Sequence, residues 1–154
     1  QQLTEHRIRF ESLHAERAEV LKTTFQKLTA LHWSLATTLA RFQPAGTAPL
    51  QEKFEQATIA AKEYRDYWDN NRIFFTPETE QLLESLDKFT REVFADLTTY
   101  PIEAKDIPET DRETRNERRE YWDKARATYE DDFSRTREAL KAEFRTYLGV
   151  ISHL

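Results

Sequence analysis

One uninterrupted stretch, Leu3–Phe42, constrains the fold of this chain more than any other part of the sequence. It covers about forty residues without a proline or a glycine, and its apolar side chains recur at steps of three and four residues. That spacing places them on one face of an α-helix. A helix of this length spans about 60 Å. The rest of the 154-residue chain must therefore be arranged along it.

The two halves of this stretch have different apolar faces. From Leu21 onward a second apolar row, which includes Phe25 and Leu39, widens the face. Before Leu21 the face is narrow, and polar side chains interrupt its heptad core positions at Arg7, His14 and Arg17. A wide face is typical of a helix inside a bundle, and a narrow one is typical of a two-helix seam. We therefore expect the second half to lie in a bundle and the first half in a stalk.

Prolines and glycines divide the remainder of the chain into three further helices. Loops are predicted at 43–49 and 100–108, and helices at about 50–70, 77–99 and 109–148. Thr76 and Pro77 supply the N-cap and the first residue of the third helix. Asn70 and Asn71 are expected to end the second helix, because asparagine tolerates the left-handed conformation of a C-cap.

These lengths predict an all-α fold, an antiparallel four-helix bundle. Its two long helices are about 3–42 and 109–148, and its shorter helical hairpin is about 50–70 and 77–99. The long helices would extend past the hairpin as a two-helix stalk, with 3–20 beside 129–148. We expect residues 1–154 to form a single helical domain. Because the chain starts at Gln1 without methionine, we expect it to be a fragment of a longer chain.

The composition narrows the possible functions. There is no cysteine, which excludes disulfides, thiolate metal sites and cysteine nucleophiles. A net charge of −5 disfavours a nucleic-acid partner. No apolar run approaches the ~18 residues that a membrane span requires. These features suit a cytoplasmic protein, with a membrane tether upstream left open, and they indicate no cofactor and no identifiable small-molecule substrate.

The predicted role is that of a non-enzymatic helical scaffold or protein-interaction module, which acts through self-association or a protein partner. The interaction residues are expected on the stalk: Phe10, Leu13, His14, Arg17, Val20, Phe144 and Ile151. One alternative is a metal-binding bundle enzyme, because Glu11 and His14 form a Glu-x-x-His motif. A second alternative is the soluble domain of a membrane-tethered protein.

Two further segments have possible roles. The arginines in 112–119 alternate with glutamates, which is typical of a solvated helix with local ion pairs. The apolar connector Arg72–Phe75 is expected to close the end of the hairpin against the long helices.

Four segments together resemble a group of uncharacterised bacterial helical proteins. They are Phe10…Leu13-His14-x-x-Arg17-Ala18-Glu19-Val20, Asn71-Arg72-Ile73-Phe74-Phe75, Thr99-Tyr100-Pro101 and Glu143-Phe144-Arg145…Leu148-Gly149. The resemblance implies a helical fold and a bacterial origin. Members of the group often carry a further charged helix upstream, and no activity or catalytic residue is carried over from them.

Overall fold

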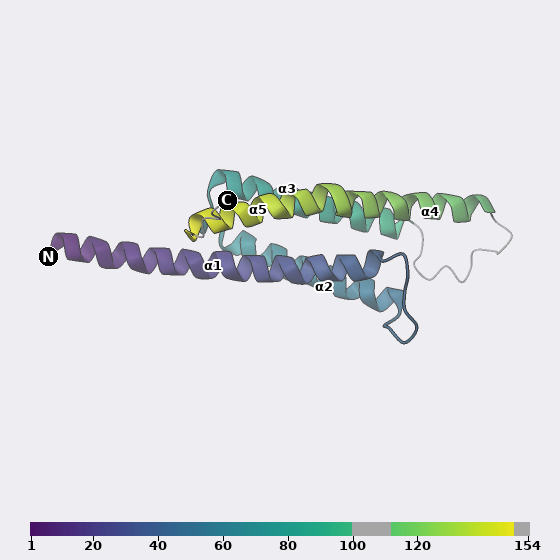
Figure 1. The fold of residues 1–154 in the computed structure, drawn as a ribbon, viewed down its shortest axis with the longest axis horizontal. Helices are drawn as coiled ribbons and strands as arrows, with labels where there is room; N and C mark the ends of the chain where they lie inside the picture. The colour runs from purple at the N-terminus through teal and green to yellow at the C-terminus, as the bar shows by residue number, and fades with distance from the viewer. Residues whose placement is uncertain (100–111, 150–154) are drawn as a thin grey trace.

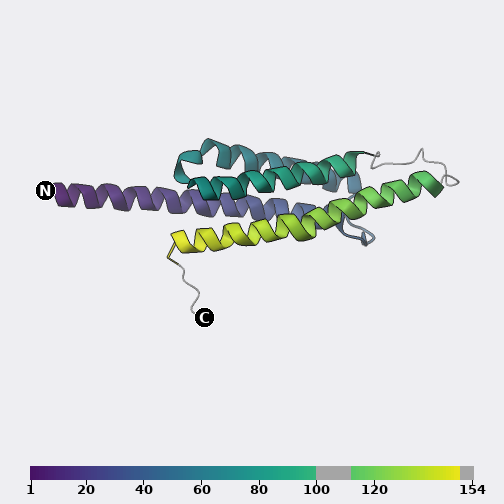
Figure 2. The same ribbon diagram turned by 90° about the horizontal axis from the view of Figure 1, so that it is seen from above.

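The computed structural model describes residues 1–99 and 112–149, and its regular secondary structure there is entirely helical, which confirms the all-α prediction. The first three rods are α1 (Gln2–Leu39), α2 (Leu50–Asn70) and α3 (Pro77–Thr98). The fourth rod is continuous and consists of α4 (Arg112–Ala127), the π-helical η2 (Thr128–Phe133) and α5 (Ser134–Tyr147). A short 3-10 turn, η1 (Arg72–Phe74), joins α2 to α3. Consecutive rods run in opposite directions (Figures 1 and 2).

Local sequence signals place the hairpin well. The predicted bounds of its two helices agree with α2 and α3 to within a residue. Thr76 caps α3 by accepting a hydrogen bond from the backbone N–H of Thr79 at 3.3 Å, as predicted. The left-handed C-cap does not form at Asn71, whose φ is −117°, and the chain turns directly into η1. Helix α1 ends at Leu39, three residues earlier than predicted.

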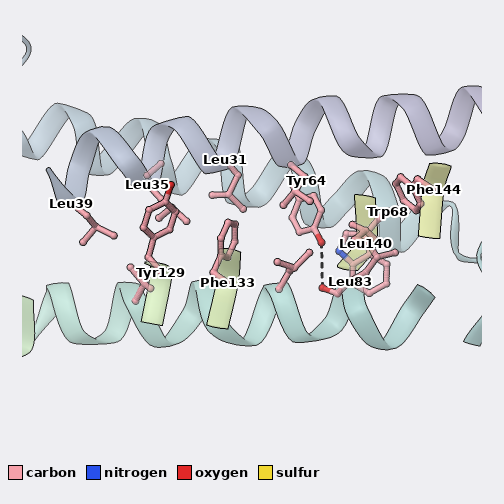
Figure 3. Close-up of a cluster of buried hydrophobic side chains, with 14 of the residues drawn as sticks. Leu31, Leu35, Leu39, Tyr64, Trp68, Leu83, Tyr129, Phe133, Leu140 and Phe144 are labelled. Carbon is pink, nitrogen blue, oxygen red and sulfur yellow. Dashed lines mark hydrogen bonds between the residues drawn. The ribbon is translucent and has the colours of Figure 1, made fainter. Parts of the chain in front are cut away.

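The core lies between the four rods (Figure 3). Its largest fully buried side chains include two aromatic residues from α2, Tyr64 and Trp68, and one from η2, Phe133. The Tyr64 hydroxyl donates a hydrogen bond to the carbonyl oxygen of Leu83 at 3.3 Å, which satisfies the hydroxyl inside the core.

The π-helical segment keeps one face of the fourth rod on this core. Tyr129 and Phe133 are buried within it, and Leu140 and Phe144 are buried after it. In an uninterrupted α-helix this apolar row would rotate steadily away from the core, since a four-residue step exceeds one turn. A π turn contains an additional residue, so it rotates the following side chains back toward the core.

The register of the fourth rod against α1 is fixed by three contacts. The Arg126 guanidinium donates to the carbonyl oxygen of Leu39 at 2.7 Å. Tyr129 and His32 are joined by a 2.9 Å hydrogen bond between the hydroxyl and Nδ1. Nearest the C-terminus, the Arg17 guanidinium lies 5.2 Å from the centre of the Tyr147 ring. The C-terminal part of this rod therefore lies beside the middle of α1, not beside its beginning.

The predicted two-helix stalk is wrong for this reason. Tyr147 ends α5 at the level of Arg17, so no other described helix lies beside residues 2–16, and each of them is exposed (Figures 1 and 2). We call residues 2–16 the overhang. A heptad repeat specifies which face of a helix is buried, but it leaves open which turn of the partner each turn meets.

Two leucines of α1 test this description, because one is in the core and one is in the overhang. Leu31 is fully buried and Leu13 is 59% exposed. We expect Leu31→Ala to lower the free energy of unfolding by about 3 kcal/mol, because it leaves a cavity. Leu13→Ala, the matched control, should change it by less than about 0.5 kcal/mol. Urea unfolding of dilute protein measures both, and similar losses would contradict the uncovered overhang.

Candidate functional site

The overhang displays the same helix face that α1 buries further along. Leu3 and Phe10 are 87% and 71% exposed and lie seven residues apart. The same seven-residue step continues through Arg17 to Thr24, Leu31 and Thr38, whose side chains are fully buried. Leu13, 59% exposed, lies beside this row. The overhang is therefore a continuation of the core face without a covering element among the described residues.

Two of the predicted interaction residues are not exposed. Val20 belongs to the core and is 8% exposed. Phe144 is 4% exposed and packs against the rings of Phe25 and Phe75, with centroids 6.3 Å away in each case. Both side chains are buried because α5 covers α1 from Arg17 onward. Helix α5 ends at Tyr147, which lies at the level of Arg17. Ile151 lies outside the described residues.

Arg17 anchors the overhang to the rest of the molecule. Its Nε donates to the carbonyl oxygen of Phe74 in η1 at 3.0 Å, and its guanidinium lies over the Tyr147 ring. His14 is exposed one turn earlier, with its ring stacked on that of Phe10 at 6.4 Å. Of the polar residues predicted on the seam, Arg17 is therefore a structural contact, and His14 belongs to the uncovered face.

A second apolar area lies at the foot of the overhang. In the connector, Phe75 is buried against Phe144, as expected for a segment that closes the end of the hairpin. Ile73, however, is 88% exposed, and Leu148 at the end of α5 is 41% exposed. We call Ile73 and Leu148 the base patch. Sequence reasoning did not separate Ile73 from Phe75, because both are apolar residues in the same short connector.

The geometry around Glu11 and His14 does not assemble a metal site from described residues. The Glu11 carboxylate pairs with the Arg7 guanidinium at 3.0 Å, on the surface. Within 1–99 and 112–149, no three histidine, aspartate or glutamate side chains gather as metal ligands. Because the motif lies on the overhang, no neighbouring described helix can supply the additional carboxylates.

His32 and Tyr129 form a partly buried pair between α1 and the fourth rod. Burial lowers the pKa of His32, and the nearby Arg137 lowers it further. Burial also raises the pKa of Tyr129. Both shifts favour the neutral side chains joined by the 2.9 Å hydrogen bond. The pair therefore serves packing and register.

Asp87 of α3 is a buried carboxyl group. It is 8% exposed, and burial raises its pKa to about 6, although Arg65 and Arg91 act in the opposite direction. Burial, together with the charge of Asp87, raises the pKa of Tyr64 well above its usual value. A raised carboxyl pKa is a feature of some catalytic acids. Here the neighbours are the core side chains of Tyr64 and Trp68 and two arginines, and the described contacts place no nucleophile beside them.

Comparison of the chain with protein-family models, curated protein sequences and solved structures yields no match. In the described residues no helix combines the length and apolar character needed to cross a bilayer. Among the described residues, the overhang and its base patch form the exposed apolar surface at this end of the molecule.

The raised pKa of Asp87 predicts how stability depends on pH. In the unfolded chain an aspartate titrates near ~3.9, whereas in the folded protein Asp87 titrates near 6. Between these values the folded state retains a proton that the unfolded state has released. The contribution of Asp87 to the free energy of unfolding therefore falls as the pH rises from about 4 to 6.

Asp87→Asn should remove this dependence. We expect the variant to be about 2 kcal/mol more stable than the parent at pH 8 and nearly equal to it at pH 4. Urea unfolding at several pH values measures the effect, with the exposed, surface-paired Asp66→Asn as the control. Equal pH profiles for the parent and Asp87→Asn would show that the buried carboxyl is not the cause.

Proposed function

We propose that this protein is a non-enzymatic helical scaffold, an antiparallel four-helix bundle that self-associates through its overhang. The observation that carries the proposal is the continuity of the buried core face of α1 onto the exposed Leu3, Phe10 and Leu13. Exposed apolar side chains in a row on a regular helix are a surface for a second helix. The partner we infer is a second copy of this chain, with the two overhangs antiparallel.

The positions of the apolar residues support this choice. The overhang spans about 22 Å. In an antiparallel pair with full overlap, the tip residue Leu3 of one copy reaches the foot of the other overhang, where Ile73 and Leu148 are exposed. Each copy then offers the same two areas to the other, as a two-fold symmetric interface requires. Both the tip and the base patch would be covered in a single arrangement.

The charges along the overhang are compatible with the same arrangement. Arg7, a polar core position of the heptad repeat, and Glu11, one turn later beside the apolar row, form an ion pair within the helix. In an antiparallel partner their order is reversed, so Arg7 of one copy faces Glu11 of the other. Complementary charges at the flanks of a helix pair select its orientation.

The polar residues within the row make the association weak and specific. Arg7 and His14 occupy core positions of the heptad repeat, where they lower stability but help to define register. The apolar contact is limited to a few side chains per copy, and small interfaces are typical of transient association. We therefore expect a reversible equilibrium between monomer and dimer.

Two substitutions on opposite faces of the overhang test the proposal. Phe10 and Ile8 are 71% and 60% exposed, but only Phe10 lies on the apolar row. We expect Phe10→Glu to abolish the concentration-dependent dimer, because it places a charge at the centre of the interface. Ile8→Glu, the matched control, should leave the dimer intact. Sedimentation equilibrium measures the association.

Both variants should retain the circular dichroism and melting temperature of the dilute parent, since neither side chain contacts the core. A parent protein that stays monomeric at high concentration would overturn the proposal. Equal weakening of the dimer by Phe10→Glu and Ile8→Glu would also contradict the proposal, because it would show that association does not depend on the apolar row.

A further inference from the structure

A second uncovered region lies at the opposite end of the molecule, where α4 extends past the end of α1 (Figures 1 and 2). One side of α4 and the segment after Leu39 line an open pocket of about 630 Å³. Its lining includes five arginines and one tryptophan: Arg41, Arg115, Arg118, Arg119, Trp122 and Arg126. Among the described residues of the lining, Asp123 is the single acidic one.

Helical periodicity explains why arginines collect here. Arg119 and Arg126 follow Arg115 by four and eleven residues. This spacing keeps the three arginines on one side of α4 together with Trp122. The glutamates at 113, 117 and 120 share a different spacing and lie on the opposite side. Charges that alternate along the sequence are thus separated into a basic and an acidic face.

The acid in the lining is already neutralised. Asp123 accepts a hydrogen bond from the Arg126 guanidinium at 3.0 Å. Arg126 is held in place by its 2.7 Å bond to the carbonyl oxygen of Leu39. By contrast, Arg115 and Arg119 make no hydrogen bond or ion pair with any described residue. Arg115 and Arg119 therefore supply two positive charges to the lining that no described carboxylate compensates.

We propose that this pocket binds a small anion that carries adjacent phosphate groups. The planar guanidinium fork matches phosphate oxygens, and several arginines can surround one multiply charged ligand. The volume is in the range typical of small-molecule sites. The half-buried Trp122 packs against the core, and the Arg126 guanidinium lies 6.0 Å from the centre of its ring, so this pair forms a fixed wall of the pocket. An extended polyanion is disfavoured by the acidic face of α4 and by the net charge of −5.

Calorimetric titration of the full chain at low salt tests this proposal. The probes are inorganic triphosphate and adenosine triphosphate. We expect saturable binding of triphosphate that weakens as salt increases. Tighter binding of adenosine triphosphate would identify an organic phosphate as the source of the anion. Equal binding of both probes would identify inorganic phosphate chains as sufficient.

Paired variants identify the pocket. Arg115→Gln combined with Arg119→Gln should weaken triphosphate binding about tenfold or more, because it removes two charge-assisted contacts. Arg135→Gln combined with Arg145→Gln removes the same charge from exposed positions on the same rod and should change binding less than about twofold. Unchanged circular dichroism verifies the fold of both.

Three results would overturn the proposal. The first is no binding of either probe at millimolar concentration. The second is an equal loss of binding in the two double variants, which would show a general charge effect. The third is arginine-dependent binding to vesicles that contain phosphatidylglycerol without binding of triphosphate, which would indicate a membrane surface as the ligand.

Discussion

The packing register between α1 and the fourth rod determines which surfaces of this protein stay uncovered. Three contacts set this register: the hydrogen bond from Arg126 to Leu39, the hydrogen bond between Tyr129 and His32, and the cation–π contact of Arg17 with Tyr147. The two rods are similar in length but are offset along their axes, so each extends past the other at one end. A flush arrangement would have covered the apolar row of the overhang and the arginine row of α4. Both proposed sites therefore depend on this one offset.

The sequence predicts the local elements well and their mutual register poorly. Thr76, Pro77 and the glycine-containing loop before Leu50 act on their immediate neighbours, so the hairpin bounds could be predicted. The contacts of Arg17 with Phe74 and Tyr147 join distant segments, and no local pattern indicates them. For the same reason the burial of Val20 and Phe144 was missed, while the exposure of Phe10 and Leu13 was expected. The arginine face of α4 could have been found from its spacing alone.

The two ends of the molecule offer different chemistry. At one end, Leu3, Phe10 and Leu13 present apolar surface on a single helix. At the other, Arg115 and Arg119 present charge around a concave pocket that contains Trp122. The core between them contains one carboxyl group with a raised pKa, Asp87, and a hydrogen-bonded pair, His32 and Tyr129. The helical body thus places the two proposed sites at opposite ends of the molecule.

Distances between paired spin labels in the associated protein test the central claim most directly. The chain has no cysteine, so Gln2→Cys and Ser12→Cys each provide a single labelling site per copy. With residues 2–16 fully overlapped in antiparallel fashion, the Ser12 labels of two copies lie about 9 Å apart along the helix axis, and the Gln2 labels lie about 21 Å apart. The account predicts strong dipolar coupling at Ser12 and weak coupling at Gln2. Equally strong coupling at both positions, or none at either, would contradict it.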